Sequence, residues 1–175
     1  MILSIIYHGI YEMMPNFITS IFFPVNESIW EHGKMILMSF LTYSFIENKL
    51  FDMKHTITNN YIAAIISMFL TYLIFTPIYL YVLKTNDNMV VTITIYLISV
   101  VISQIIKERY IHIDNSKIGL IGFILTFVIY GILTYSPLRL PIFYDYREKI
   151  YGIRWCGDYC SVNTRTSRSP CTTTS

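Results

Sequence analysis

Long uncharged stretches alternate with short polar connections along most of this chain. Three of them, residues 61–82, 89–106 and 118–135, are long enough as helices to cross a hydrocarbon core of ~30 Å at ~1.5 Å per residue. Their Val, Ile and Tyr content is typical of strands in water, but a lone strand in lipid leaves its backbone groups unpaired. The pattern therefore predicts membrane-spanning helices, the first of them kinked at Pro77.

Two less regular apolar segments precede these three. Residues 29–51 lie between charged ends, which fits a span with polar groups at both interfaces. Residues 1–14 are short for a full crossing, and residues 17–23 indicate an interfacial or re-entrant piece. The sequence thus predicts an all-α integral membrane bundle of about five transmembrane helices, forming one domain over residues 1–153.

The end of the chain has a different composition. Residues 161–175 are rich in Ser and Thr and contain almost no apolar side chains. Such a segment cannot bury enough apolar surface to offset the entropy of ordering. We therefore expect residues 154–175 to form a disordered tail.

Composition and charge agree with lipid as the main solvent. The 175 residues are 54% hydrophobic and only 14% charged, whereas a soluble domain has roughly 25% charged residues. The net charge of +2, without a block of Lys and Arg, argues against nucleic acid as a partner. The expected partner is the lipid bilayer, while the oligomeric state and the absolute orientation stay open.

The most polar stretch within the apolar region is PVNESIWEHGK, residues 24–34. If a helix begins here, Asn26 is a suitable N-cap and Glu27 suits the positive end of the helix dipole. At 100° per residue, four polar side chains then share an arc of roughly 140°: Glu27, Ser28, Glu31 and His32. The alternative is a capped helix start with Trp30 as an interfacial anchor and Lys34 reaching towards water near Glu31.

A second polar pair lies in the first apolar segment. His8 and Glu12 are i,i+4 neighbours on one helix face. An ionisable group at mid-bilayer costs about 2.5–3.5 kcal/mol on insertion scales, so such groups usually face a partner or a water-filled cavity. Either the segment sits shallow and the two side chains solvate each other, or they converge with the polar face that follows. Histidine and carboxylates suit both divalent metals and acid–base chemistry, although no standard metal motif is matched.

The expected number of crossings places a further carboxylate, Asp145, on the same side of the membrane as the polar stretch. With five crossings, the connection before residue 29 and the segment after the last helix lie on one side. That last segment, residues 137–153, contains Asp145 among Pro and aromatic residues and is expected to return to the polar stretch. His112 lies on the opposite side and is expected to be an ordinary loop residue.

These motifs resemble an uncharacterised family of small bacterial multi-pass membrane proteins. Its pattern is H-x2-Y-E, then PVNES-x-WEH-x-K, then P-x-F-x-D followed by YG. The matching residues are Tyr11, Glu12, residues 24–32, Lys34, Pro141, Phe143, Asp145, Tyr151 and Gly152. The resemblance covers residues 6–153, although the first helix is shorter than the family's. It implies a bacterial cytoplasmic membrane location and a grouping of the polar residues, and it implies no reaction.

Two functions stay open. One is a membrane-embedded hydrolase or transferase on a lipid-like substrate, and the other is a non-catalytic small carrier or a structural subunit whose polar cluster locks helices together. For the enzyme, the candidate catalytic residues are Glu27, Glu31, His32 and Asp145, the substrate-binding residues are Asn26, Ser28 and Lys34, and a divalent metal would be held by His8, Glu12 and His32. Six side chains are expected around one interfacial cavity, with Trp30 outside it: His8, Glu12, Glu27, Glu31, His32 and Asp145.

Overall fold

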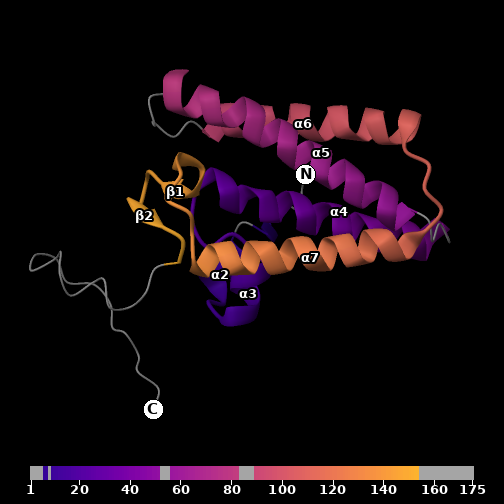
Figure 1. Ribbon diagram of the computed structural model, residues 1–175, viewed down its shortest axis with the longest axis horizontal. Helices are drawn as coiled ribbons and strands as arrows, with labels where there is room; N and C mark the ends of the chain where they lie inside the picture. The colour runs from indigo at the N-terminus through magenta and orange to yellow at the C-terminus, as the bar shows by residue number, and fades with distance from the viewer. Residues whose placement is uncertain (1–5, 8, 52–55, 83–88, 154–175) are drawn as a thin grey trace, which may run out of the picture.

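The computed structural model describes residues 6–7, 9–51, 56–82 and 89–153. The fold is mostly helical, as predicted. Four long helices run side by side: α4 (Ile29–Phe51), α5 (Thr56–Pro77), α6 (Met89–Tyr110) and α7 (Ser116–Tyr135) (Figure 1). Successive helices run in opposite directions, so the start of α4 and the end of α7 lie at the same end of the bundle. We call this the proximal end, and the opposite one the distal end.

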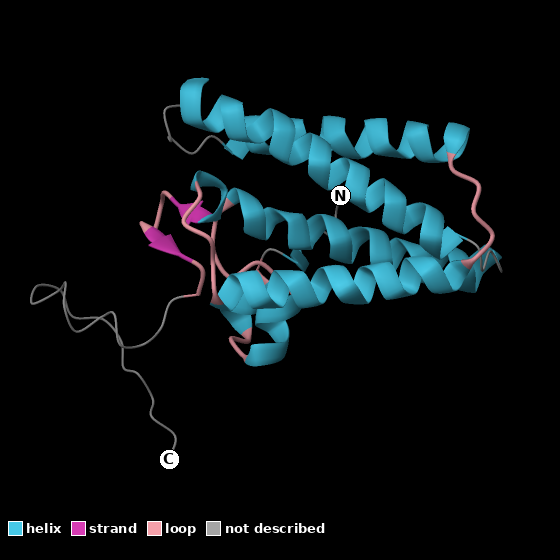
Figure 2. Cartoon of the chain, viewed as in Figure 1, coloured by secondary structure: helices cyan, strands magenta, loops and turns pink. Residues whose placement is uncertain are grey.

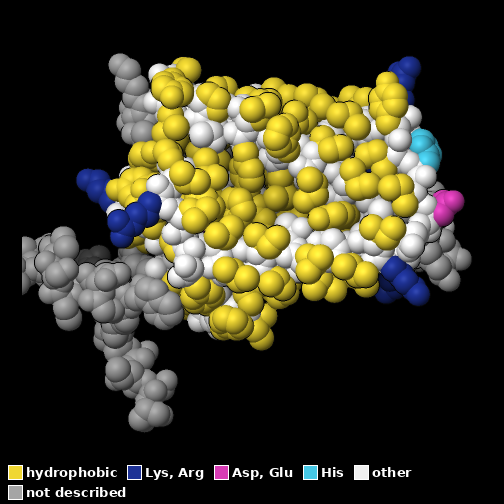
Figure 3. All heavy atoms as spheres, viewed as in Figure 1, with side chains coloured by type: hydrophobic (Ala, Val, Ile, Leu, Met, Phe, Trp, Pro, Cys, Tyr) yellow, Lys and Arg dark blue, Asp and Glu magenta, His cyan; other side chains and the backbone are white. Residues whose placement is uncertain are grey.

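Three helical segments are long and apolar enough to cross a membrane. They are Thr56–Val82, Val90–Tyr110 and Ser116–Tyr135, and they coincide with the three long uncharged runs in the sequence. In the face shown in Figure 3, hydrophobic side chains cover the middle of the molecule and the charged ones gather at its two ends. This distribution is typical of a protein whose middle lies in hydrocarbon.

The predicted disturbance at Pro77 takes the form of a change in helix type. The α-helix α5 ends at Pro77 and continues as a π-helical turn, η1 (Ile78–Val82). Proline has no N–H to donate, and its ring clashes with the carbonyl four residues earlier. A wider π turn is one way for a helix to absorb such an interruption.

Two short helices precede the long ones, α2 (Ile10–Met13) and α3 (Phe17–Phe22). Asn16 and Thr19 form a capping box that starts α3. The phenyl ring of Phe22 packs edge-on against Phe127 of α7, with ring centroids 5.0 Å apart. The segment predicted to be interfacial is therefore a short helix packed against the proximal half of the bundle.

The chain after α7 folds back over the proximal end. A 3-10 turn, η2 (Pro141–Phe143), leads into a small antiparallel hairpin of β1 (Tyr144–Asp145) and β2 (Ile150–Tyr151) (Figure 2). Gly152 follows with a φ of 64°, which favours glycine. The Ile153 N–H then donates to the Thr134 carbonyl at 3.3 Å, which fastens the hairpin to the last turn of α7.

Candidate functional site

The polar stretch before α4 is ordered by its own side chains. Ser28 caps the helix, because its Oγ accepts from the Glu31 N–H at 3.4 Å and its carbonyl accepts from the His32 N–H at 3.3 Å. Asn26 Oδ1 accepts from the Ser28 N–H at 2.9 Å, while its Nδ2 donates to the Gly152 carbonyl at 2.7 Å. The predictions that Asn26 is the N-cap and that Glu27 lies in the first turn are wrong. The Asn26 amide ties the loop to the hairpin instead.

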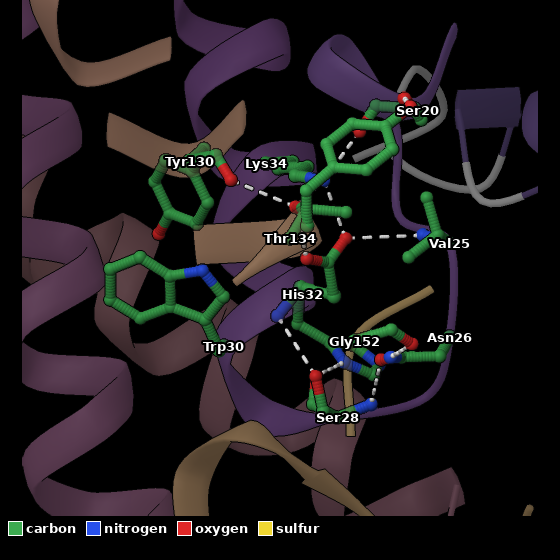
Figure 4. Close-up of polar contacts among 12 residues, drawn as sticks. Ser20, Val25, Asn26, Ser28, Trp30, His32, Lys34, Tyr130, Thr134 and Gly152 are labelled. Carbon is green, nitrogen blue, oxygen red and sulfur yellow. Dashed lines mark hydrogen bonds and ion pairs between the residues drawn. The ribbon is translucent and has the colours of Figure 1, made fainter. Parts of the chain in front are cut away.

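Glu31 and Lys34 form a buried ion pair, with Lys34 Nζ 2.6 Å from Glu31 Oε2. The ammonium also donates to the Ser20 carbonyl at 2.6 Å and to Thr134 Oγ1 at 2.7 Å. Glu31 accepts from Thr134 Oγ1 at 2.8 Å through Oε1 and from the Val25 N–H at 3.1 Å through Oε2 (Figure 4). We call these residues the proximal lock.

The proximal lock is closed to water. The residues Lys34 and Glu31 are 0% and 2% exposed. A buried ion pair is tolerated when its geometry is good and its remaining hydrogen-bonding groups are satisfied, and here every ammonium hydrogen has an acceptor. Lys34 lies near Glu31, as the sequence placed it, but the buried ion pair between them was not predicted. The alternative in which Lys34 reaches towards water is wrong, because the side chain points into the bundle.

Asp145 returns to the polar stretch, as predicted from the helix count. Its Oδ2 accepts from the Glu27 N–H at 2.8 Å. Its Oδ1 accepts from the N–H groups of Arg147 and Glu148 at 2.8 and 3.0 Å. The side chain is fully buried. The carboxylate therefore closes the hairpin turn and fastens it to the loop before α4.

His32 and Glu27 are the more accessible acid–base groups of the polar stretch. His32 Nε2 lies 3.7 Å from Glu27 Oε2, and the two side chains are 17% and 24% exposed. His32 Nδ1 lies 2.8 Å from the Ser28 carbonyl oxygen. A carbonyl only accepts, so Nδ1 carries the hydrogen and Nε2 is the nitrogen that faces the carboxylate.

A pocket of about 300 Å³ opens at the proximal end, between α2, the loop before α4 and the hairpin. We call it the interfacial pocket. Its lining residues are Tyr11, Glu12, Pro15, Pro24, Val25, Asn26, Glu27, Asp145, Arg147, Glu148 and Ile150. Of the six side chains expected around one cavity, Glu12, Glu27 and Asp145 line it, whereas Glu31 and His32 do not. His8 lies outside the described residues. The substrate-binding candidates are divided too, because Asn26 lines the pocket and Ser28 and Lys34 do not.

Trp30 is also absent from the pocket lining, as expected. It packs inside the bundle instead of reaching outward as an anchor. Its ring centroid lies 4.4 Å from that of Tyr130, 4.7 Å from that of Phe143 and 5.8 Å from that of Tyr72. This aromatic contact joins α4, α5, α7 and η2 beside the proximal lock.

Aromatic residues also surround the hairpin. Tyr146 packs edge-on against Tyr79 and Tyr144, with ring centroids 5.4 and 4.8 Å away. Burial raises the pKa of the Tyr146 hydroxyl, and the nearby Tyr151 and Tyr144 hydroxyls add to the effect. This phenol therefore stays neutral at ordinary pH and does not act as an anion beside the pocket.

A second polar network, at the distal end, was missed by sequence reasoning. Lys107 Nζ donates to Asn60 Oδ1 at 3.0 Å, and Asn60 Nδ2 donates to Glu47 Oε2 at 2.7 Å. Lys107 Nζ also lies 2.9 Å from Glu108 Oε1. The sequence shows Asn60 and Lys107 at the ends of two apolar runs, but that position is equally typical of two separate residues at the membrane interface.

The distal network borders a cavity of about 250 Å³, here called the distal cavity. Its lining residues are Glu47, Thr56, Asn59, Lys107, Glu108, Ile111, His112 and Asp114. His112 lies in the connection between α6 and α7, as expected of a loop residue. It nevertheless belongs to a hollow lined by several charged groups, at the opposite end from the polar stretch.

Within the described residues, no group of three or more His, Cys, Asp or Glu side chains is arranged to hold a metal ion. The expected divalent metal at His8, Glu12 and His32 includes one residue outside that part of the chain. The metal therefore stays a prediction.

Fold and site together define a mostly helical protein with three helices fit to cross a membrane and a polar cluster at one end. The chain belongs to DUF6512, a family of unknown function, whose family model matches residues 1–153. No curated protein and no solved structure matches the chain. Family membership is thus established, and any activity has to be argued from the geometry.

Proposed function

We propose that this is a multi-pass integral membrane protein with about five crossings, of which α4 and the N-terminal segment join the three apolar helices. At ~1.5 Å per residue the 23 residues of α4 extend about 35 Å, enough to cross a bilayer. Tyr7 of the N-terminal segment pairs with Thr42, near the middle of α4, with the two hydroxyl oxygens 2.8 Å apart. This contact lies beside the middle of α4 and supports a crossing that includes Tyr7. The resemblance to small bacterial membrane proteins favours a bacterial cytoplasmic membrane.

The role that the geometry supports best for the polar stretch is a non-catalytic one, in which the proximal lock holds helices together. The observation that carries this proposal is Lys34, which is fully buried and uses its ammonium on three acceptors from α3, α4 and α7. A general base or a substrate-binding cation has to reach its substrate, and these two charges are sealed. The lock would keep the loop and the hairpin in place around the interfacial pocket.

The exchange of Glu31 for Gln tests this role. Gln keeps the size and one acceptor but removes the negative charge, so it leaves the Lys34 ammonium buried without its partner. Breaking a buried pair in this way typically costs about 3–5 kcal/mol. We expect a clear fall in the melting temperature of the detergent-purified protein, with Glu108→Gln, at a 74% exposed side chain, as the matched control. A Glu31→Gln protein that is as stable as the wild type, or more stable, would contradict the structural role of the proximal lock. Unchanged or raised stability is what replacement of an active-site residue typically gives.

The enzyme is the second candidate, and the Glu27–His32 pair favours it. These two groups combine partial exposure with a 3.7 Å separation, and Glu27 lines the interfacial pocket. In a hydrolase or transferase on a lipid-like substrate, His32 Nε2 would take the proton of a nucleophile and Glu27 would stabilise the resulting imidazolium. Asp145 would shape the pocket without joining the chemistry, because backbone N–H groups occupy both of its oxygens.

Two measurements separate the candidates. Hydrolysis of a fluorogenic acyl ester in detergent micelles, lost in both Glu27→Gln and His32→Gln at unchanged melting temperature, would establish the enzyme. Elemental analysis of the same purified protein tests the metal, and a stoichiometric divalent ion lost in Glu12→Gln would support ligation there. No turnover above that of a mock preparation, together with a destabilised Glu31→Gln, is the result expected of a lock.

A further inference from the structure

The buried edge of α6 is unusual for a membrane helix. In the described part of α6, the buried side chains are Ile95, Ser99, Ser103 and Lys107. Their spacing of four places them along one edge of the helix. α6 packs chiefly against α5, so this edge faces α5. The surface that α6 turns towards the protein is thus more polar than the one it turns towards lipid.

The contact between Lys107 and Asn60 fixes which residues of the two helices lie opposite each other. Ser99 lies eight residues before Lys107 and Ser67 lies seven residues after Asn60, which correspond to rises of about 12 and 10.5 Å along antiparallel helices. Seven residues are also close to two full turns, so Ser67 shares the face of Asn60. Ser67 and Ser99 therefore lie at similar depths along the two antiparallel helices, and both are fully buried.

The two hydroxyls at this level are unusual in a second way. A buried hydroxyl in a helix normally donates to a carbonyl of the preceding turn, as Ser103 Oγ does to Val100 at 2.8 Å and Thr71 Oγ1 does to Ser67 at 2.8 Å. Ser67 Oγ and Ser99 Oγ have no hydrogen-bond partner among the described residues. An unpaired buried hydroxyl costs roughly 1–3 kcal/mol.

Close helix packing explains only part of this arrangement. Small residues at an interface let two membrane helices approach, and alanine serves that purpose equally well. Ala63 and Ala64 of α5 lie at the level of Ser103 and are fully buried. Packing accounts for the size of Ser67 and Ser99 and leaves their hydroxyls unexplained. Buried water typically pairs with such groups, making two to four hydrogen bonds.

We propose that the interface lined by Ser67, Ser99, Ser103 and Lys107, here called the α5–α6 seam, binds a line of internal water that enters from the distal cavity. The polar side chains of α6 recur every ~6 Å along the axis, a gap that one or two waters bridge. Lys107 stands where the line meets the distal cavity, whose lining supplies Glu108, His112 and Asp114. The protein thus provides a hydrated route for protons from the distal surface to the middle of the bilayer. This inference depends on the membrane insertion proposed above and is independent of the proximal lock.

Single cysteines test the water line. In full-length protein with the three native cysteines, Cys156, Cys160 and Cys171, replaced by Ser, we would compare Ser103→Cys, Ser99→Cys and Ile98→Cys in native membranes. Ile98 is 48% exposed on the outer side of α6, next to Ser99 in depth. Methyl methanethiosulfonate is small and reacts with the thiolate, which forms only where water reaches the thiol. The modified fraction is read by intact mass after delipidation, and the melting temperature of each variant checks its fold.

A hydrated seam predicts that Ser103→Cys and Ser99→Cys react at least tenfold faster than Ile98→Cys. Equal and slow reaction of all three would mean a dry seam that only packs, and would overturn the inference while leaving the membrane protein intact. Fast reaction of Ile98→Cys would instead show that α6 is in water, which contradicts the proposed crossing. If Ser99→Cys unfolds, the same comparison is made between Ser67→Cys and Ile65→Cys on α5, where Ile65 is 36% exposed.

Discussion

The two ends of the bundle each hold a buried lysine, and they use it differently. At the proximal end Lys34 contacts Glu31 directly, at 2.6 Å, and neither side chain meets water. At the distal end Lys107 donates to Asn60, which in turn donates to Glu47, and its other partner, Glu108, is 74% exposed. One network is closed by protein on all sides, and the other borders an open cavity.

This difference shows which charges are available for chemistry. A sealed pair contributes order, because each charge is compensated only by its partner and removal of either leaves the other unpaired. Lys107 instead lines the distal cavity and pairs with the largely exposed carboxylate of Glu108, so its removal leaves no sealed charge at that carboxylate. The polar stretch contains the sealed pair, whereas Lys107 and Glu108 at the distal end line a cavity.

The largest expected effect is at Lys34. Lys34→Met fills the space but leaves the Glu31 carboxylate buried without a counter-charge. We expect a loss of about 3–5 kcal/mol in the free energy of unfolding, measured by denaturant or thermal unfolding in detergent. Lys49→Met, at an exposed side chain near the end of α4, is the matched control and should change little. If Lys34→Met were as stable as this control, the buried ion pair would not stabilise the proximal end, and the two lysines would not differ in this respect.

Close helix packing provides the next comparison. A Cβ added at Gly119, near the distal end, would lie 2.4 Å from the Thr58 Cα, so α7 has to move away from α5. Gly119→Ala should cost about 1–3 kcal/mol through overpacking. At Gly131, near the proximal end, the nearest atom is a side-chain carbon of Ile21 at 3.4 Å. Gly131→Ala should therefore be well tolerated, and equal effects of the two changes on the melting temperature would contradict this packing.

Lys107→Met should lower the free energy of unfolding less than Lys34→Met. It removes one charged donor from Asn60 Oδ1, worth about 1.5–3 kcal/mol, while Glu108 stays solvated. We expect the free energy of unfolding to fall by less than in Lys34→Met, in the same detergent and assay. A larger loss at Lys107 would reverse the roles assigned to the two ends.

The smallest effect is expected beyond the hairpin. Residues 154–175 lie outside the described residues, and the family match ends at residue 153. Their composition offers little apolar surface to bury. A stop codon after Ile153 should leave membrane insertion and melting temperature unchanged. A marked fall in either would show that the tail contributes to the proximal end.

Much of the fold follows from the sequence because hydrocarbon imposes simple rules. The three uncharged runs predicted the helices α5, α6 and α7, since a chain in hydrocarbon satisfies its backbone groups as a helix. An assumed count of five crossings predicted that Asp145 would return to the polar stretch. The sequence predicted a start of α4 that is too early, because Asn26 and Ser28 are both suitable N-cap residues. What decided between them was the distant Gly152 carbonyl, which takes the Asn26 amide.

The proximal lock was less predictable than the helices. Glu31 and Lys34 are i,i+3 neighbours, so the sequence placed them near each other, whereas their buried ion pair depends on contacts from α3 and α7. Thr134 is a lone hydroxyl in an apolar run and gave no sign that it would bond both charges. Similarly, a polar line of Ser99, Ser103 and Lys107 at every fourth position is visible in the sequence, but only the α5–α6 contact shows that it is buried.

A double-mutant cycle at Glu31 and Lys34 measures whether the two side chains act as a sealed pair. Unfolding free energies would be measured for wild type, Glu31→Gln, Lys34→Met and the double variant in one detergent. We expect each single change to cost about 3–5 kcal/mol and the double variant to lose far less than the sum, because no charge is left unpaired. Additive losses, with a coupling energy near zero, would contradict the sealed pair.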